Sequence, residues 1–515
     1  QAPGFYELAC LDAKAGRFAE ALEHVNESIL RQYQCMKARA LKENILRKLG
    51  RVKEAEELHK ESLKIDPLYD RQPEKINHNT LLELVIDLYE AGDYTQGIAL
   101  AEKWVEQKSA KGENIYPLVY YYIAYGYDNL PSAEAAGPAE HYAALGEKAV
   151  ADGCFPHRTE DYIVLKRLAA EYDLGMAYYY LGCLLYDKRV YGEAVADYEK
   201  AALKYPEFPT VHRNLALAYY NVKKQPQRAY EELTRAFALD ETDARVYLEL
   251  DQLKKRLNVP VKERWSDMEK HFDLVESRDD LYLEYVTLLN TLGEPEKALG
   301  LIMVRKFHQW EGGEGKVAAQ YLTALYQLAK AAVAKEDYAE AKELLLRAVY
   351  EYPHNLGEGK LESAQENNLY YLLGLAQEKL GETEEAFVNL TKACYGESEP
   401  VGMMYYNDQP PEMIYYQGLA YRKLGDEEQA VQRFCKLVDY GKEHIGDEIK
   451  IDYFAVSLPD LLIFEEDLKE RNRKHCLFMM SLGLRGLGQT DEAKACAEEL
   501  LSMDNAHQGI RVHDL

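Results

Sequence analysis

The sequence predicts an all-α protein in which about twelve helix pairs stack into a solenoid, a right-handed superhelix with insertions between its repeats. One pattern of glycine, alanine and aromatic residues recurs along the chain, and its clearest copies are offset by 34 residues. Self-similarity at such an interval is typical of repeat proteins. The length of 515 residues agrees with this prediction, because an array keeps growing when each unit buries its apolar face against its neighbours.

The best copy runs from Met176 to Pro206 and reads MAYYYLGCLLYDKRVYGEAVADYEKAALKYP. Gly182 and Ala194 are small enough for two antiparallel helices to approach closely, and Tyr198 fills the space beside them. Proline cannot continue the second helix, so it ends there. The large, small and aromatic positions of the pattern are Tyr178, Leu181, Gly182, Leu185, Tyr191, Ala194, Tyr198, Ala201 and Pro206.

The same pattern recurs on both sides of this copy. A glycine, an apolar residue and an alanine share one spacing at Gly16, Phe18 and Ala21 and at Gly50, Val52 and Ala55. A glycine followed by a small residue marks further copies at Gly92/Gly97, Gly293/Ala298, Gly381/Ala386, Gly425/Ala430 and Gly488/Ala493. Glycine-free copies around Ala229 and Ala341 and degenerate units at 118–150 and 244–275 complete the twelve.

We divide the predicted solenoid into N-terminal repeats at 1–150, central repeats at 151–275 and C-terminal repeats with loop insertions at 276–515. Insertions are expected at 66–78, 105–117, 151–174, 305–320, 353–367, 395–412 and 440–474. Loops carried on a rigid scaffold often hold recognition residues, so a site is expected there first. Because the chain starts at Gln1, without Met and close to the first helix, we expect a further domain upstream.

Composition restricts the kinds of partner. Acidic residues outnumber basic ones by 88 to 62, giving a formal charge of −26, which repels phosphate backbones and anionic membranes. We therefore expect no nucleic-acid and no membrane partner. The eight cysteines form no CxxC pair, which favours reduced thiols in a cytoplasmic protein without a metal or other cofactor.

The pattern resembles the tetratricopeptide repeat (TPR). A wider resemblance rests on the stretches CFPHR (154–158), FALDETDARVYLELDQLKKRL (237–257), RKFHQWEGGEGKVAAQY (305–321) and YPHNLGEGKLESAQENNLYYLLG (352–374). These look like the C-terminal TPR half of large bacterial proteins whose N-terminal region is a β-sandwich domain of unknown function. The resemblance implies a link to carbohydrate metabolism, although a fold alone does not fix a function.

The loop around Trp310 is the first candidate ligand site. His308, Glu311 and Glu314 surround this aromatic side chain within seven residues. An indole face packs against the apolar side of a sugar while carboxylates accept hydrogen bonds from its hydroxyls. The structural alternative is a tight glycine-rich connection between repeats that the tryptophan anchors by burial.

A second loop repeats the letters GEGK and presents Asn355, Glu358 and Lys360. Neighbouring repeats should bring the segments 305–320 and 353–367 together, so the two loops are expected to flank one polar pocket. Chance similarity between two loops of simple composition is the alternative.

The tyrosines give a further signal, because runs such as Tyr415-Tyr416 lie at first-helix positions. Consecutive helical residues point about 100° apart, so one tyrosine can enter the core while the other faces the concave surface. Such a surface suits an extended peptide or a sugar.

No nucleophile elbow, HExxH motif or phosphate loop is present. Glu311 and Glu314 are the remaining catalytic candidates, as a glycosidase pair. We therefore predict a non-catalytic scaffold that binds a protein, a peptide or its own β-sandwich domain on the concave face. The alternative is a carbohydrate-binding or carbohydrate-active protein with a site at the Trp310 loop.

Overall fold

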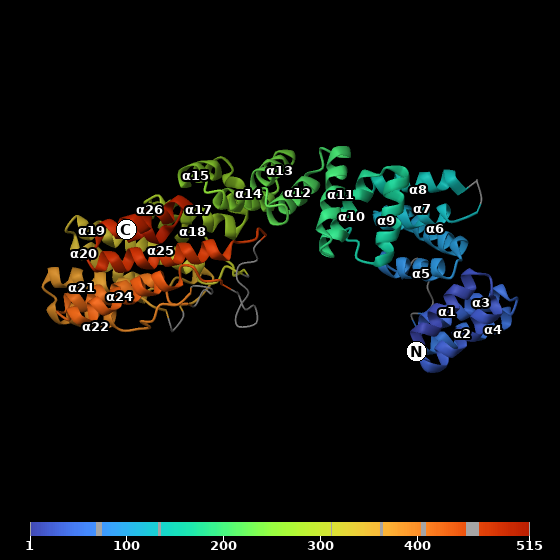
Figure 1. The fold of residues 1–515 in the computed structure, drawn as a ribbon, viewed down its shortest axis with the longest axis horizontal. Coiled ribbons are helices and arrows are strands. Elements are labelled where there is room, and N and C mark those ends of the chain that lie inside the picture. Colours follow the sequence, from blue (N-terminus) through green and yellow to red (C-terminus); the bar gives the residue numbers. More distant parts are fainter. Residues whose placement is uncertain are drawn as a thin grey trace. The chain divides into compact units, whose positions relative to one another are not determined.

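Helices follow one another along the chain in the computed structural model (Figure 1), and the described residues form twelve helix pairs. The structure describes residues 2–67, 69, 75–131, 135–310, 312–360, 364–402, 408–449 and 463–513, and none of these lies in a β-strand. The predicted all-α repeat architecture is confirmed. The pairs are α1/α2, α3/α4, α5/α6, α7/α8, α10/α11, α12/α13, α14/α15, α17/α18, α19/α20, α21/α22, α23/α24 and α25/α26.

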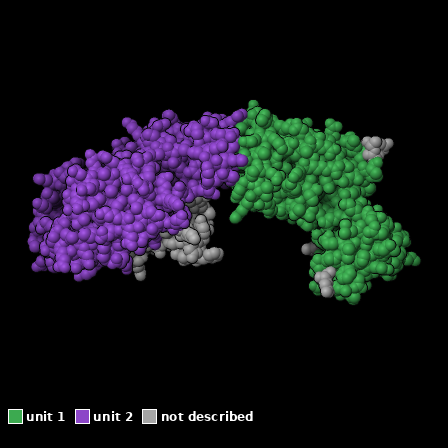
Figure 2. Space-filling view, in the orientation of Figure 1, with its two compact units in different colours: residues 1–215 green, residues 216–515 purple. Residues whose placement is uncertain are grey.

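The chain consists of two compact units, residues 1–215 and 216–515 (Figure 2). The helices of unit 1 are α1 Ala2–Lys14, α2 Phe18–Arg31, α3 Met36–Lys48, α4 Val52–Ile65, α5 His78–Glu90, α6 Tyr94–Ala110, α7 Pro117–Asp128, α8 Ala136–Lys148, α9 Thr159–Tyr172, α10 Gly175–Asp187 and α11 Tyr191–Lys204. Helix α12, Pro209–Asn221, spans the boundary between the units.

Unit 2 contains the remaining helices. These are α13 Pro226–Leu239, α14 Ala244–Arg256, α15 Val261–Lys270, α16 Phe272–Ser277, α17 Asp279–Thr291, α18 Pro295–Val304, α19 Lys316–Ala334, α20 Tyr338–Tyr350, α21 Asn367–Leu380, α22 Thr383–Cys394, α23 Pro411–Lys423, α24 Glu427–His444, α25 Leu468–Gly486, α26 Thr490–Met503 and α27 Gln508–Val512. A 3-10 turn lies at His354–Leu356. Helices α9, α16 and α27 stand outside the pairs.

The two helices of a pair touch where the sequence predicted small residues. A Cβ atom added to Gly182 on α10 would lie 2.7 Å from the ring of Tyr198 on α11. Ala194 is fully buried at the same contact. Glycine and alanine are therefore fixed here by the short distance between the helices.

In most repeats the turn between the two helices contains a left-handed residue. Gly16 and Gly50 fill this position with φ of 75°, as expected of a residue without Cβ. Four turns place a non-glycine residue in the same conformation, namely Arg189 (φ 61°), Lys224 (φ 53°), Asn258 (φ 56°) and Glu336 (φ 62°). The repeat geometry therefore imposes this backbone conformation even where the sequence does not favour it.

Candidate functional site

The surface formed by the first helices of the last five pairs, α17, α19, α21, α23 and α25, is here called the inner face of unit 2. The C-terminal segment of the chain, residues 504–513, is seated on this face. Residues of this segment contact side chains of α19, α23 and α25. The repeat pattern of the sequence does not predict this docking.

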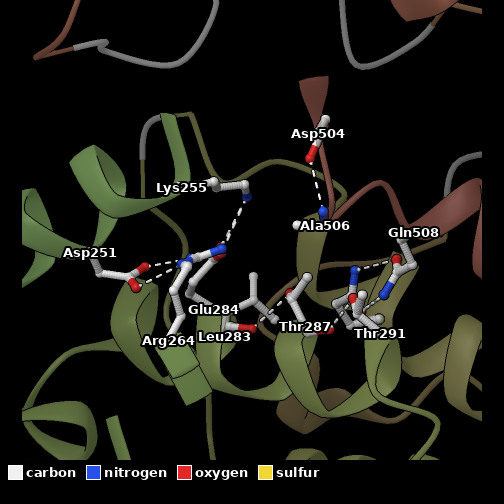
Figure 3. Close-up of polar contacts among 11 residues, drawn as sticks. Asp251, Lys255, Arg264, Leu283, Glu284, Thr287, Thr291, Asp504, Ala506 and Gln508 are labelled. Atoms are coloured by element: carbon white, nitrogen blue, oxygen red, sulfur yellow. Dashed lines mark hydrogen bonds and ion pairs between the residues drawn. The ribbon is translucent and has the colours of Figure 1, made fainter. Parts of the chain in front are cut away.

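The C-terminal segment leaves α26 through a tight turn. Asp504 accepts a hydrogen bond from the N–H of Ala506 at 3.1 Å (Figure 3). His507 Nδ1 accepts one from the N–H of Ile510 at 3.3 Å. His507 thereby satisfies an N–H group in the first turn of α27, which has no earlier turn to supply acceptors. Ile510 is buried and is one of the apolar anchors of the segment.

Asn505 fixes one end of the segment to the turn between α14 and α15. Its main-chain N–H donates to Asn258 Oδ1, and its side-chain amide donates to the Asn258 carbonyl, both at 2.7 Å. In return, Val261 N–H donates to Asn505 Oδ1 at 3.1 Å. Asn258 adopts a left-handed backbone with φ of 56°, which asparagine tolerates better than most residues.

The middle of the segment is held by polar side chains of α19. Gln320 and Gln508 exchange side-chain hydrogen bonds at 3.1 and 3.0 Å. Asn290 on α17 donates to Gln320 Oε1 at 3.0 Å and so orients that amide. Further along α19, Lys330 Nζ donates to the Val512 carbonyl at 2.7 Å. A main-chain carbonyl is available at every residue, so this last contact does not depend on the bound side chain.

The far end of the segment enters an aromatic site. Tyr416 OH lies 2.9 Å from His513 Nδ1 and 2.5 Å from Tyr326 OH. Burial raises the pKa of Tyr416 far above its ordinary value, so the phenol keeps its proton. Tyr416 therefore shares one hydrogen bond with the ring nitrogen of His513 and another with the hydroxyl of Tyr326. Tyr415, the preceding residue, packs on Phe434, and both tyrosines of the pair are buried.

His507 packs on Phe478 of α25, with ring centroids 4.8 Å apart. Burial lowers the pKa of His507 to about 4, although Asp504 opposes the shift, and the positive charges of His475 and Lys474 lower it further. The neutral imidazole is also the form in which Nδ1 accepts the Ile510 N–H. Protonation therefore conflicts with both the packing and the cap.

A buried ion cluster holds the receiving turn in place (Figure 3). Arg264 on α15 binds both carboxylate oxygens of Asp251 on α14, at 3.0 and 2.6 Å, and Glu284 on α17 at 2.7 Å. Burial opposes ionisation of Glu284, yet Lys255 and Arg264 together lower its pKa to about 2. These charges join three helices around the turn that carries Asn258.

The two predicted loops lie against each other, but their polar groups mainly connect them. Asn355 donates to the carbonyls of Ile302 and Arg305 at 2.8 and 2.9 Å, and its own carbonyl accepts from Phe307 N–H. Glu358 accepts from the N–H groups of Gly315 and Ala318 at 2.7 and 3.0 Å, capping α19. Both side chains are thus used in the fold.

The remaining predicted site residues are distributed around these loops. His308 is exposed and contacts Asp279 through its N–H at 2.9 Å. The indole of Trp310 covers Gly313, where an added Cβ would lie 2.3 Å from it. Lys360 pairs with Glu366 at 2.6 Å. Glu314 is exposed, and Glu311 lies outside the described residues. Ligand binding at these loops stays a prediction.

The described residues offer little for a metal site, a membrane-spanning helix or a small-molecule pocket. No group of three metal-ligating side chains occurs among these residues, and no helix there is both long and apolar enough to cross a bilayer. All eight cysteines are free. A hollow in unit 1 beside Asn44 and Asp93 measures about 60 Å³, far below the size of a small-molecule pocket.

Comparison with known proteins identifies the repeats. Tetratricopeptide repeat models match residues 6–70 and 179–244, residues 323–355 and 412–440, and residues 368–395 and 475–507. These segments are tetratricopeptide repeats, as the residue pattern indicated. They lie in both units and include α19, α21, α23 and α25 of the inner face.

Two crystal structures are similar over nearly the whole chain. The P58(IPK) TPR domain is 11% identical, with 95% of this chain and 99% of that chain covered and a TM-score of 0.23. Yeast Tom70 is 11% identical, with 96% of each chain covered and a TM-score of 0.27. Scores this low do not establish a shared arrangement of the whole chain.

Proposed function

We propose that this chain is a non-catalytic protein-interaction scaffold that receives a segment of a partner polypeptide on the inner face of unit 2. One observation carries the proposal: residues 504–513 are themselves a stretch of polypeptide held on that face. Tetratricopeptide repeats are protein-interaction modules, which supports the same conclusion for the chain as a whole.

The side chains of the inner face suit recognition of a peptide. Gln320 and Lys330 offer donors to amide and carbonyl oxygens, which every polypeptide carries. Tyr416 adds a hydroxyl group next to the ring of Tyr326, which favours a flat polar side chain. Main-chain contacts supply affinity and the side-chain pocket supplies selectivity, as in other peptide grooves.

The partner segment can belong to another protein or to the same polypeptide. The β-sandwich region implied by the bacterial resemblance is one such partner on the same chain, and a cytoplasmic setting fits the reduced thiols. The contacts of the neighbouring loop do not favour a sugar over a structural role, because Asn355, Glu358 and Lys360 already bind protein groups.

Panning a phage library of random dodecapeptides against the full chain tests the proposal. An enriched peptide is then synthesised with a photoreactive benzoylphenylalanine and cross-linked, and the adducts are mapped by mass spectrometry. We expect adducts on α17, α19, α23 and α25. The second helices α20, α22, α24 and α26 serve as the internal control surface.

Two controls sharpen this experiment. Excess unlabelled peptide should remove the adducts, and a scrambled peptide should give none. Failure to enrich any peptide, or adducts concentrated on second helices or in unit 1, would contradict the assignment of this face.

A further inference from the structure

The C-terminal segment is held in a way that differs from the core of the repeats. Helix α27 has only five residues, too few to be stable without its contacts. Ile510 and Val512 are its buried aliphatic residues. Hydrogen bonds to the inner face and ring contacts of the flanking His507 and His513 make up the other contacts of the segment. A segment with only two buried aliphatic side chains opens at a lower free-energy cost than the helices of the core.

The contacts are also spaced as a bound peptide would make them. Asn505 is held at the turn between α14 and α15, Gln508 at α19, and His513 between α19 and α23. Two of the receiving side chains also have partners outside the segment, because Gln320 is bound by Asn290 and Tyr416 by Tyr326. These receiving residues of α19 and α23 therefore keep partners when the segment leaves.

We infer that residues 504–513 are an internal ligand of the inner face and that a partner binds there by displacing them. The inference rests on the proposed function and names how that same site is regulated. The incoming segment must offer one amide side chain to Asn258 and another to Gln320, a main-chain carbonyl to Lys330 and a ring nitrogen to Tyr416. A short helical peptide that combines an asparagine, a glutamine and a histidine has this chemistry.

The covalent attachment of the segment to α26 determines how strongly it competes with a free peptide. The segment begins directly after Met503, the last residue of α26, so its effective concentration at the face is in the millimolar range or above, as for a very short linker. A free peptide of the same sequence should bind the intact chain weakly. The same peptide should bind well to a variant in which the attached segment is held less tightly and the receiving residues are unchanged.

The test uses a fluorescent peptide of residues 503–513 and the full chain in a polarisation assay. The variant Asn505→Ala/His513→Ala weakens only the attached segment, and we expect it to bind the peptide at least tenfold more tightly than the wild-type chain. Gln508→Ala should give a smaller increase. Ser502→Ala, outside the segment, should bind as weakly as the wild type, and a peptide carrying both alanines should not bind.

Circular dichroism and thermal unfolding show whether the double variant keeps its fold. A folded double variant that binds the peptide no better than the wild-type chain does overturns the inference. Loss of the helical fold in the double variant also overturns it, because the segment would then be a necessary part of the core. If dodecapeptides still cross-link to the inner face in any of these cases, the scaffold function stands and only the displacement mechanism falls.

Discussion

Asn505 donates two hydrogen bonds of 2.7 Å to Asn258, which lies 247 residues earlier in the sequence of unit 2. Asn258 also donates to the Ser502 carbonyl at 2.9 Å. The pair attaches the end of the last repeat to the turn between α14 and α15. The C-terminal segment therefore begins its path across the inner face from a fixed point.

Replacing Asn258 should separate its side-chain role from its backbone role. Asn258→Gly accepts the left-handed backbone but loses the amide, and we expect it to lower the free energy of unfolding by about 1–2 kcal/mol. Asn258→Ala adds the steric penalty of that backbone and should lose about 1 kcal/mol more. Urea denaturation measures both, and equal effects of the two substitutions would contradict the left-handed assignment.

One matched pair of glycines tests the contact between α10 and α11. Gly182→Ala forces a methyl group against Tyr198 and should lower the free energy of unfolding by about 1–3 kcal/mol. Gly192→Ala places the same methyl group where nothing lies within 4 Å, so it should be neutral or slightly stabilising. Chemical denaturation of the two variants checks the difference, and similar midpoints would show that the helix register is wrong.

The left-handed turns predict a stabilising substitution. Arg189→Gly removes a non-glycine residue from φ of 61° and should raise the free energy of unfolding by about 0.5–1 kcal/mol, after allowing for the greater freedom of glycine in the unfolded chain. Gly50→Ala is the reverse control, because its added Cβ would meet nothing within 4 Å and only the backbone is penalised. Thermal unfolding should shift in opposite directions for the two variants.

Docking of the C-terminal segment should weaken in acid. The pKa of His507 is lowered from 6.5 to about 4 in the folded state, so the docked state favours the neutral ring. Its contribution is complete above about pH 6.5 and is lost as the pH falls toward 4. The charged and titratable groups that face the ring are Asp504, Lys474 and His475.

The peptide assay measures this pH effect. Binding of the 503–513 peptide to the double variant should weaken between pH 6.5 and pH 4.5. A peptide with His507→Asn keeps a capping oxygen but has no titrating ring, so most of this pH dependence should disappear. An unchanged profile would assign the effect to another group, of which His475 on the receiving helix is the nearest alternative.

The sequence predicted the repeats because their cause is local. Gly182, Ala194 and Tyr198 recur with a spacing that close helix packing demands, and the structure pairs them as expected. The adjacency of the two GEGK loops was also predictable, because loops of neighbouring repeats lie close together.

The inner-face contacts were harder to predict because their partners are far apart in sequence. Nothing near Asn258 indicates that it meets Asn505, and Gln320 and Gln508 are 188 residues apart. One signal was present: the residues after Met503 fit no repeat, yet they contain two histidines and a buried Ile510 and Val512. A segment with such residues needs a surface on which these side chains can pack.

Hydrogen–deuterium exchange of the full chain tests the central claim most directly, by comparing the wild type with Asn505→Ala. We predict slow exchange at residues 508–513 in the wild type, and faster exchange there and on α17 in the variant, while α10 in unit 1 stays unchanged. Complete exchange of residues 508–513 in the wild type at the earliest time point would contradict the claim that this segment occupies the inner face.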